Sequence, residues 1–223
     1  MIVKTQGIVL SHVDFGERSV IVKLYTKDYG YQGFVVNGVR SAKSRQGMAY
    51  FQPFTVLDMV MYMKPSRDLH RISEFKSIVS WYAEDIKRQT IILFLAEVVN
   101  KLLRNEHTEN PSLFNYLMEG IQHYKSSESV ENFHLIFLLQ MTSYLGITVL
   151  SGGELFENMD KVADQQDIEN LIDQLLDSSL QNTIEASGDL RFRSLEVLMH
   201  YFQHHVPGFG QVHSLKVLQQ IFR

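Results

Sequence analysis

The apolar pattern changes its period once, at about residue 80, and this change constrains the fold more than any other feature of the sequence. Before it, short segments of β-branched and aromatic residues alternate with polar residues and are separated by turn residues, a pattern typical of strands with one buried face. After it, apolar residues recur at helical spacing. The sequence therefore predicts an α+β chain, in which a small β domain is followed by an all-helical domain.

Five short strands are expected in the first 76 residues. We place them at residues 7–13, 19–26, 31–36, 55–62 and 69–75. The connection between the third and the fourth is much longer than the others. Five short strands with one long connection fit a small closed Greek-key barrel of the OB type. We therefore assign residues 1–78 to an N-terminal five-stranded OB-fold barrel and residues 79–223 to the helical domain.

The helical domain is expected to contain six helices. We place them from Trp81 to about Leu103, from residue 110 onward, and at residues 131–145, 164–176, 192–206 and 213–222. The helix at 131–145 is apolar on all sides, which predicts a buried helix. Gly146 follows it as a natural C-cap. No flexible linker separates the two domains, so we expect the helices to pack directly on the barrel.

The charge of the chain is divided unevenly along its length. Residues 1–76 hold 11 Lys and Arg against 6 Asp and Glu, a net of +5, whereas the rest has a net of −9. This asymmetry indicates a basic module that meets a polyanion. Cys is absent, which excludes disulfides, thiolate metal sites and a cysteine nucleophile. No signal peptide or membrane span is recognisable. We therefore expect a cytoplasmic protein with no membrane partner.

A cationic segment follows the third strand. The chain leaves that strand at Asn37-Gly38, two residues that tolerate positive φ. Arg40, Lys43 and Arg45 come next, with small or hydroxylic residues between them and no acidic residue. A solvated surface loop is the alternative interpretation. We predict that these three residues bind DNA phosphates. Further cations could extend the track: Lys23, Lys27, Arg67 and Arg71.

Aromatic residues of the second and third strands could stack on bases, as in other barrels that bind single strands. The candidates are Tyr25, Tyr31 and Phe34. Half or more of the barrel aromatics must fill the core, and the sequence does not say which.

No catalytic constellation is recognisable. The sequence contains no P-loop, dinucleotide fingerprint or nucleophile elbow. His200 and His204 have the spacing of two metal ligands on a helix, but Tyr201 stands where a zincin would place its Glu. These histidines are better explained as solvated side chains. We predict no catalytic residue, no metal and no cofactor, and therefore no enzyme.

Several segments, in their order and spacing, resemble the bacterial RecO family of recombination mediators. They are Lys4-Thr-Gln-Gly-Ile-Val-Leu10, Phe15-Gly-Glu17, Leu24-Tyr-Thr26, Gly38-Val-Arg40, Gln52-Pro-Phe54, Asp68-Leu-His-Arg-Ile-Ser-Glu74 and His204-His-Val-Pro-Gly-Phe209. No single segment is diagnostic, but together they cover essentially the whole chain. The resemblance implies the same architecture, an OB barrel followed by helices.

The resemblance also implies a non-catalytic role in the repair of DNA damage by recombination, carried out at the nucleoid. Members bind single- and double-stranded DNA, anneal complementary strands, and with RecR help to load RecA onto DNA coated by single-strand-binding protein. A pocket on the helical domain is implied for the acidic, Phe-ended C-terminal tail of single-strand-binding protein. Candidates for its cationic rim are Lys101, Arg104 and Lys125.

The sequence departs from the family pattern in two places. Many members carry four zinc-binding cysteines after the third helix, where this chain has Ser151-Gly-Gly-Glu154 and no Cys. Zinc is therefore not expected. Members also often have a Lys where this chain has Asn37, so one phosphate contact is missing.

Two other functions stay open. One is a protein–protein adaptor that does not bind DNA and whose basic segment is incidental. The other is a small nucleic-acid-processing enzyme, which is disfavoured because no metal or nucleophile constellation is present.

Overall fold

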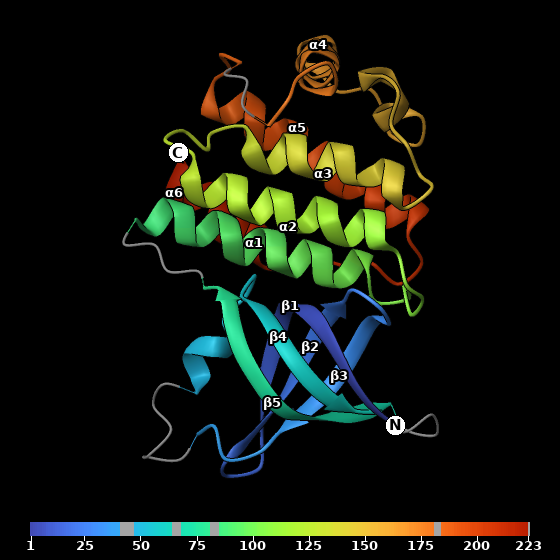
Figure 1. The fold of residues 1–223 in the computed structure, drawn as a ribbon. Coiled ribbons are helices and arrows are strands. Elements are labelled where there is room, and N and C mark those ends of the chain that lie inside the picture. Colours follow the sequence, from blue (N-terminus) through green and yellow to red (C-terminus); the bar gives the residue numbers. More distant parts are fainter. Residues whose placement is uncertain (41–46, 64–67, 81–84, 181–183, 223) are drawn as a thin grey trace. The chain divides into compact units, whose positions relative to one another are not determined.

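The chain folds into a closed barrel followed by helices, as expected (Figure 1). The computed structural model describes residues 1–40, 47–63, 68–80, 85–180 and 184–222. These residues cluster into two compact units, Met1–Ile121 and Gln122–Arg223. The predicted architecture, an OB-type barrel plus a helical domain, is confirmed. The domain boundary after residue 78 stays a prediction.

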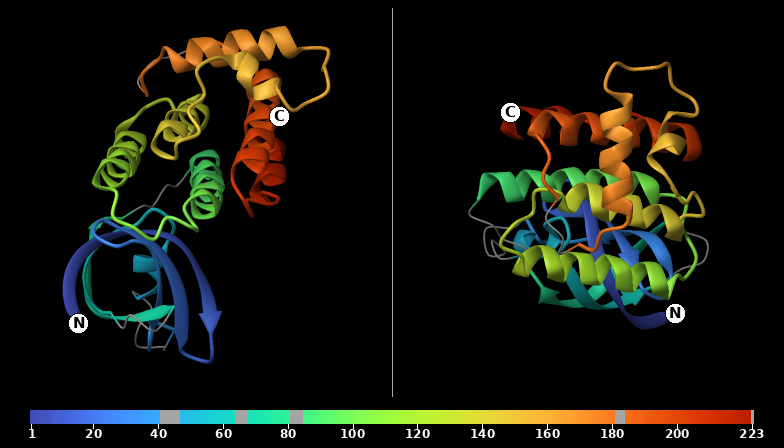
Figure 2. Two further views of the ribbon diagram at one scale, coloured as in Figure 1. Left: turned by 90° about the vertical axis from the view of Figure 1, so that its right-hand side faces the viewer. Right: turned by 90° about the horizontal axis from the view of Figure 1, so that it is seen from above.

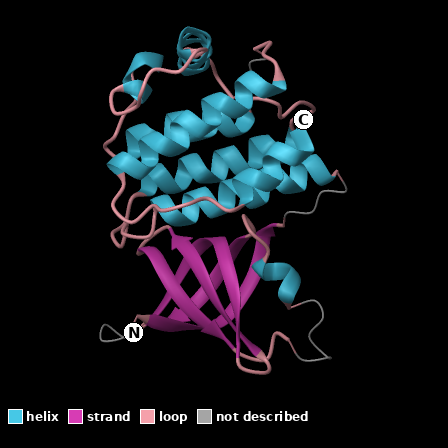
Figure 3. Ribbon diagram, turned by 180° about the vertical axis from the view of Figure 1, so that it is seen from behind, coloured by secondary structure: helices cyan, strands magenta, loops and turns pink. Residues whose placement is uncertain are grey.

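The barrel strands are β1 (Ile2–Phe15), β2 (Ser19–Thr26), β3 (Gly30–Val36), β4 (Val56–Tyr62) and β5 (Leu69–Val79). They close in the order β1-β2-β3-β5-β4, and Figure 3 shows them as one barrel. The pairing of β3 with β5 is parallel and the other pairings are antiparallel. β1 is longer than expected because it serves two neighbours: its first half pairs with β4 and its second half with β2.

The barrel interior is filled by the alternating apolar residues of its strands. Val20, Val22 and Leu24 of β2 all point into this core, as their alternation in the sequence predicts. A short 3-10 helix that the sequence analysis did not place, η2 (Met48–Phe51), brings the buried Phe51 to the same core. Phe54 follows with φ 61° and is also buried. Packing and a hydrogen bond from its N–H to the Val9 carbonyl (2.7 Å) hold this unfavourable backbone conformation.

Helix α1 (Ile86–Leu102) and the segment after it also belong to the first unit. Asp85 caps the helix by accepting a hydrogen bond from the Lys87 N–H (2.8 Å). The segment 103–110 then lies against the turn between β2 and β3. The Tyr31 N–H donates to the Glu106 carbonyl (2.7 Å), and a side chain at Gly30, which has φ 62°, would collide with that carbonyl. Gly30 therefore permits a contact that no other residue type allows.

The second unit is helical. α2 (Pro111–Ser126) begins in the first unit and ends in the second. The elements that follow are α3 (Phe133–Tyr144), η3 (Gly152–Phe156), α4 (Gln165–Leu176), α5 (Gly188–His205) and α6 (Ser214–Phe222). α4 lies across α3 and α5 (Figure 2). α3 is buried on nearly all sides, which confirms the prediction for residues 131–145. No helix among the described residues is long and apolar enough to cross a membrane.

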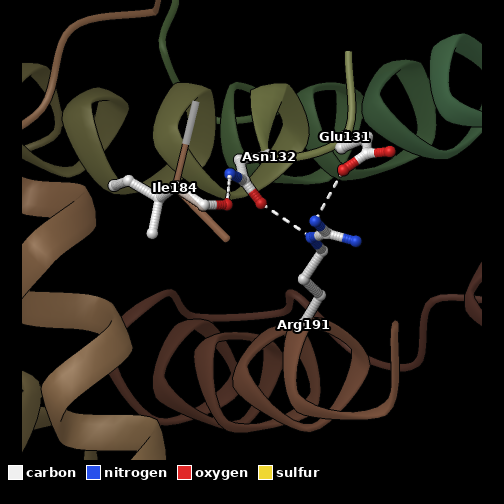
Figure 4. Close-up of polar contacts among 4 residues, drawn as sticks. All are labelled: Glu131, Asn132, Ile184 and Arg191. Carbon is white, nitrogen blue, oxygen red and sulfur yellow. Dashed lines mark hydrogen bonds and ion pairs between the residues drawn. The ribbon is translucent and has the colours of Figure 1, made fainter. Parts of the chain in front are cut away.

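A polar network holds the start of α3 (Figure 4). The Asn132 amide donates to the Ile184 carbonyl (2.7 Å) and accepts from Arg191 Nε (2.8 Å). Arg191 also pairs with Glu131 (2.7 Å). His134, the second residue of α3, is buried, and burial together with Arg191 lowers its pKa to about 4. The network thus joins three segments that are distant in sequence, next to a neutral buried histidine.

The segment 151–154, where the family resemblance implies cysteines in many members, leads into η3, which packs against α4. The Gly152 N–H donates to the Asp173 carboxylate (2.6 Å), and a side chain at Gly152 would collide with the backbone of Glu169. Leu155 and Phe156 are buried. Close backbone approach, one charge-assisted hydrogen bond and apolar burial therefore hold η3 in place.

Candidate nucleic-acid interface

The first residue of the predicted cationic segment is attached to the hairpin between β1 and β2. Arg40 pairs with Asp14 (3.0 Å), and its guanidinium also donates to the Gly16 carbonyl (3.1 Å). Its backbone N–H donates to the Arg18 carbonyl (3.3 Å). The guanidinium thus lies on the tip of this hairpin. The other predicted phosphate ligands of the segment, Lys43 and Arg45, lie outside the described residues.

An exposed aromatic residue that the sequence analysis did not select lies on the same hairpin. Phe15, at the end of β1, is 50 % exposed, and Val13, two residues before it on the same strand, is 58 % exposed. Phe15 lies between Asp14 and Gly16 in the chain, the two residues that the Arg40 side chain contacts. An exposed aromatic ring on a hairpin that also carries a cation is a surface on which an unpaired base can stack. The sequence signal was present but unspecific, because an aromatic residue at a strand end usually packs inward.

Three predicted residues with different expected roles line one cleft of the first unit. Lys23 was expected to bind phosphate, Tyr31 to stack on a base, and Arg104 to bind a partner tail. The cleft has a volume of about 580 Å³ and runs between the strands β2, β3 and β5 and the segment after α1. The structure therefore groups these side chains although they are distant in the sequence.

Two further predicted cations are exposed on the barrel but do not line this cleft. Lys27 lies in the turn between β2 and β3, and Arg71 lies on β5 opposite Val35 of β3. Along β2, cations thus occur at three places: Arg40 beside the hairpin at its start, Lys23 in its middle and Lys27 just past its end. At a rise of about 3.3 Å per residue, β2 is about 23 Å long. Arg67 lies outside the described residues.

The predicted stacking role does not fit two of the three aromatic residues. Tyr25 and Phe34 have no exposed surface, so neither ring can meet a base, and the prediction is wrong for both. Phe34 fills the barrel core, and burial together with Glu106 raises the pKa of Tyr25. Tyr31 is 6 % exposed and forms one wall of the cleft, where its hydroxyl donates to the Asn100 side chain (2.9 Å).

The cations expected to rim a tail pocket do not gather at one pocket. Lys101 forms an ion pair with Glu97 within α1 (3.9 Å), Arg104 lines the barrel cleft, and Lys125 lies near the end of α2. A separate pocket of about 660 Å³ lies in the second unit and is mostly apolar. Its walls include Met159, Val162, Ile168, Val197 and Leu215, and its cation is Arg193.

Arg193, in the lining of this pocket, forms ion pairs with two acidic residues. It pairs with Asp164 (2.6 Å) and with Asp189 (3.4 Å). The hydrogen bond from Arg193 holds the pKa of Asp164 below its usual range. His200 of the predicted histidine pair lines the same pocket. Nowhere in the described ranges do three His, Asp or Glu side chains come together as metal ligands.

The fold and its exposed cations define a class of protein: an OB-type barrel followed by helices, an architecture whose barrel serves single-strand binding in many proteins. Comparison with known proteins identifies the family. Residues 1–81 match the family model "Recombination protein O N terminal", and residues 83–150 match "Recombination protein O C terminal". The chain belongs to the RecO family of DNA repair proteins.

Relatives named DNA repair protein RecO match along their entire length. The proteins of Flavobacterium psychrophilum and Flavobacterium johnsoniae are 31% and 32% identical to this chain, and that of Phocaeicola vulgatus is 30% identical. In each case the match covers 100% of this chain and 100% of the relative. The resemblance derived from the sequence segments is confirmed.

Proposed function

We propose that this protein is a DNA-binding recombination mediator. It binds single- and double-stranded DNA, anneals complementary strands and, with RecR, helps to load RecA onto DNA coated by single-strand-binding protein at the nucleoid. The observation that carries the proposal is Arg40, held on the hairpin tip of an OB-type barrel at the start of a segment with two further cations. Full-length similarity to DNA repair proteins supports it.

Annealing of this kind requires no chemical step. Two strands repel each other through their phosphates, and cations that neutralise part of this charge lower the barrier to pairing. Contacts to phosphate carry no sequence information, so any complementary pair can be annealed. The function thus needs a cationic surface and exposed bases rather than catalytic groups. We therefore propose that the protein is not an enzyme and works without a cofactor.

The proposal is tested by DNA binding across a salt series. Fluorescence anisotropy with a labelled single strand compares the wild type with a triple variant, Arg40→Ala, Lys43→Ala and Arg45→Ala. The matched control removes three cations outside the barrel, Lys87→Ala, Lys161→Ala and Lys216→Ala. On single strands each neutralised phosphate contributes roughly −0.7 to the salt slope. The barrel variant is expected to bind several-fold more weakly, with a slope shallower by about 2, and to anneal more slowly.

The adaptor alternative predicts a different result. If the barrel variant and the control bind DNA equally well and with equal salt slopes, the cationic segment is not the DNA site. The protein would then act through protein partners alone. Turnover of DNA in the presence of Mg²⁺ would instead favour the processing enzyme.

For the tail of single-strand-binding protein, we propose the apolar pocket of the second unit. Its apolar walls suit a terminal Phe ring, and Arg193 can pair with an acidic group. Because Arg193 already pairs with Asp164, an incoming carboxylate must compete with that pair. A labelled acidic peptide that ends in Phe is expected to bind the wild type and the Lys101→Ala variant, but not the Arg193→Ala variant. Loss of binding in Lys101→Ala alone would move the site to α1.

A further inference from the structure

The cleft of the first unit has the size of a small-molecule site. Its volume of about 580 Å³ lies within the range of about 300–1,000 Å³ typical of ligand pockets. One side is formed by strands, including Lys23 of β2 and Gly33 of β3, and the other by Arg104 and Asn105, which follow α1. All these residues belong to one compact unit, so the cleft is a property of that unit alone.

Two permanent cations converge on the same wall of the cleft. Lys23 Nζ lies 5.7 Å from the centroid of the Tyr31 ring. Arg104 is near enough to the same tyrosine to lower its pKa, against the larger effect of burial, which raises it. Neither cation forms an ion pair within the described part of the chain. Their charge is therefore available to a ligand.

Gly33 makes room for the lysine. A Cβ atom at this position would lie 2.9 Å from Lys23 Nζ and 2.9 Å from a methyl carbon of Leu69. Any other residue would push the ammonium group away from the strand. The Lys23 side chain thus lies over the backbone of Gly33, in space that the absent Cβ leaves open.

Two further polar groups of the cleft, Gln32 and His70, are neutral and already oriented. Gln32 donates to the Tyr29 carbonyl (2.7 Å), so its side-chain oxygen faces His70 Nε2 (3.1 Å), and that nitrogen carries the proton. Burial lowers the pKa of His70, although Asp68 acts in the opposite direction. The imidazole is therefore neutral at pH 7. Among the lining residues that the structure describes, Asp68 is the acidic one, so two cations there face one carboxylate.

We propose that this cleft binds the phosphate monoester of a single nucleotide, between Lys23 and Arg104. The charge favours a monoester over a phosphate within a strand, because a monoester carries about −1.5 to −2 at pH 7 and a backbone phosphate carries one negative charge. The apolar wall of Tyr31 and Met63 lies beside the nucleoside, and Gln32 and Asn105 offer amides to it. The monoester can belong to the 5′ end of a DNA strand or to a free mononucleotide. The first source rests on the proposed function, and the second does not.

Two titrations with the full-length protein separate these sources. In the first, anisotropy compares a 5′-phosphorylated oligonucleotide with a 5′-hydroxyl oligonucleotide of the same sequence. In the second, calorimetry measures binding of thymidine 5′-monophosphate without any DNA. The variants are Lys23→Gln and Arg104→Gln, each checked for an unchanged melting temperature. Lys76→Gln is the matched control, because Lys76 is an exposed cation of the same barrel that does not line the cleft.

The wild type and the control are expected to bind the phosphorylated strand about tenfold more tightly than the hydroxyl strand, since two solvent-accessible ion pairs are added. Each cleft variant is expected to lose most of this preference, measured as the ratio of its affinities for the phosphorylated and the hydroxyl strand, whatever its affinity for the hydroxyl strand. If the wild type binds the mononucleotide, the cleft variants do not, and the wild type shows no preference for the phosphorylated strand, the cleft is assigned to a free nucleotide. Absence of both effects overturns the proposal, as does a preference that survives in both variants. If the protein does not bind DNA at all, the calorimetric titration still decides whether the cleft binds a phosphate monoester.

Discussion

Removal of the carboxylate that holds Arg40 tests whether this arginine binds phosphate. Arg40 pairs with Asp14, and the two side chains are 33% and 61% exposed. A phosphate must compete with Asp14 for the guanidinium, so the pair opposes DNA binding. Ion pairs this exposed contribute about 0.2–1 kcal/mol. In the Asp14→Asn variant, Arg40 keeps its hydrogen bond to the Gly16 carbonyl and therefore its place on the hairpin.

The Asp14→Asn variant is therefore expected to bind single-stranded DNA about 1.4- to 5-fold more tightly than the wild type, the ratio that this energy range corresponds to. Anisotropy at several salt concentrations measures it. Glu17→Gln is the matched control, because it removes the same charge from the same hairpin but is not the partner of Arg40. Equal gains in both variants would show that only the general charge of the hairpin matters. Weaker binding by Asp14→Asn would show that the pair positions Arg40 for DNA and does not compete with it.

Three further outcomes are expected. Phe15→Ala should weaken binding to single strands by about 1–3 kcal/mol, while affinity for duplex DNA and the salt slope stay unchanged, because stacking needs unpaired bases; an equal loss on duplex DNA would contradict this. His134 binds its proton with a pKa of about 4 in the folded state and about 6.5 when unfolded, so the unfolded state binds more protons between these values. Urea unfolding should therefore show that His134 lowers the free energy of unfolding by about 2 kcal/mol as the pH drops from 7.5 to 5. The His134→Gln variant should lack this contribution to the pH dependence. A fragment of residues 1–80 should melt at a lower temperature than residues 1–121, since Tyr31 loses its hydrogen bonds to Asn100, Glu106 and His107; equal melting temperatures would show that the barrel is independent of the segment after α1.

Local patterns predicted the elements well. The bounds of β2 agree with the predicted range 19–26, because Val20, Val22 and Leu24 alternate with less buried residues within the strand itself. The buried helix α3 was equally visible, since its residues are apolar on every side. Both features depend on residues that are close together in the sequence, and the apolar periodicity compares such residues directly.

The parts of the site that sequence reasoning missed depend on distant contacts. Tyr31 is on the outer side of the barrel, yet it is buried because the segment 103–110, some 75 residues later, covers it. Arg104 was expected to serve a partner tail, and only the fold brings it to the barrel cleft. Likewise, the pairing of Arg40 with Asp14 follows from the register of a hairpin and a strand end, which no spacing within the cationic segment reveals.

The barrel is closed by a short seam. The parallel pairing of β3 with β5 covers Gly33 to Val35 on one strand and Leu69 to Arg71 on the other. The antiparallel pairing of β2 with β3, by contrast, covers all of β3 and all of β2 except its first residue. A seam this short is where the barrel opens most easily, so its amides are expected to exchange hydrogen fastest among the strand amides. The cleft lies on this seam, with lining residues from both strands. A ligand that binds only the closed form slows the opening by mass action, so the exchange rate of a few amides at the seam becomes a direct reading of how fully the cleft is occupied.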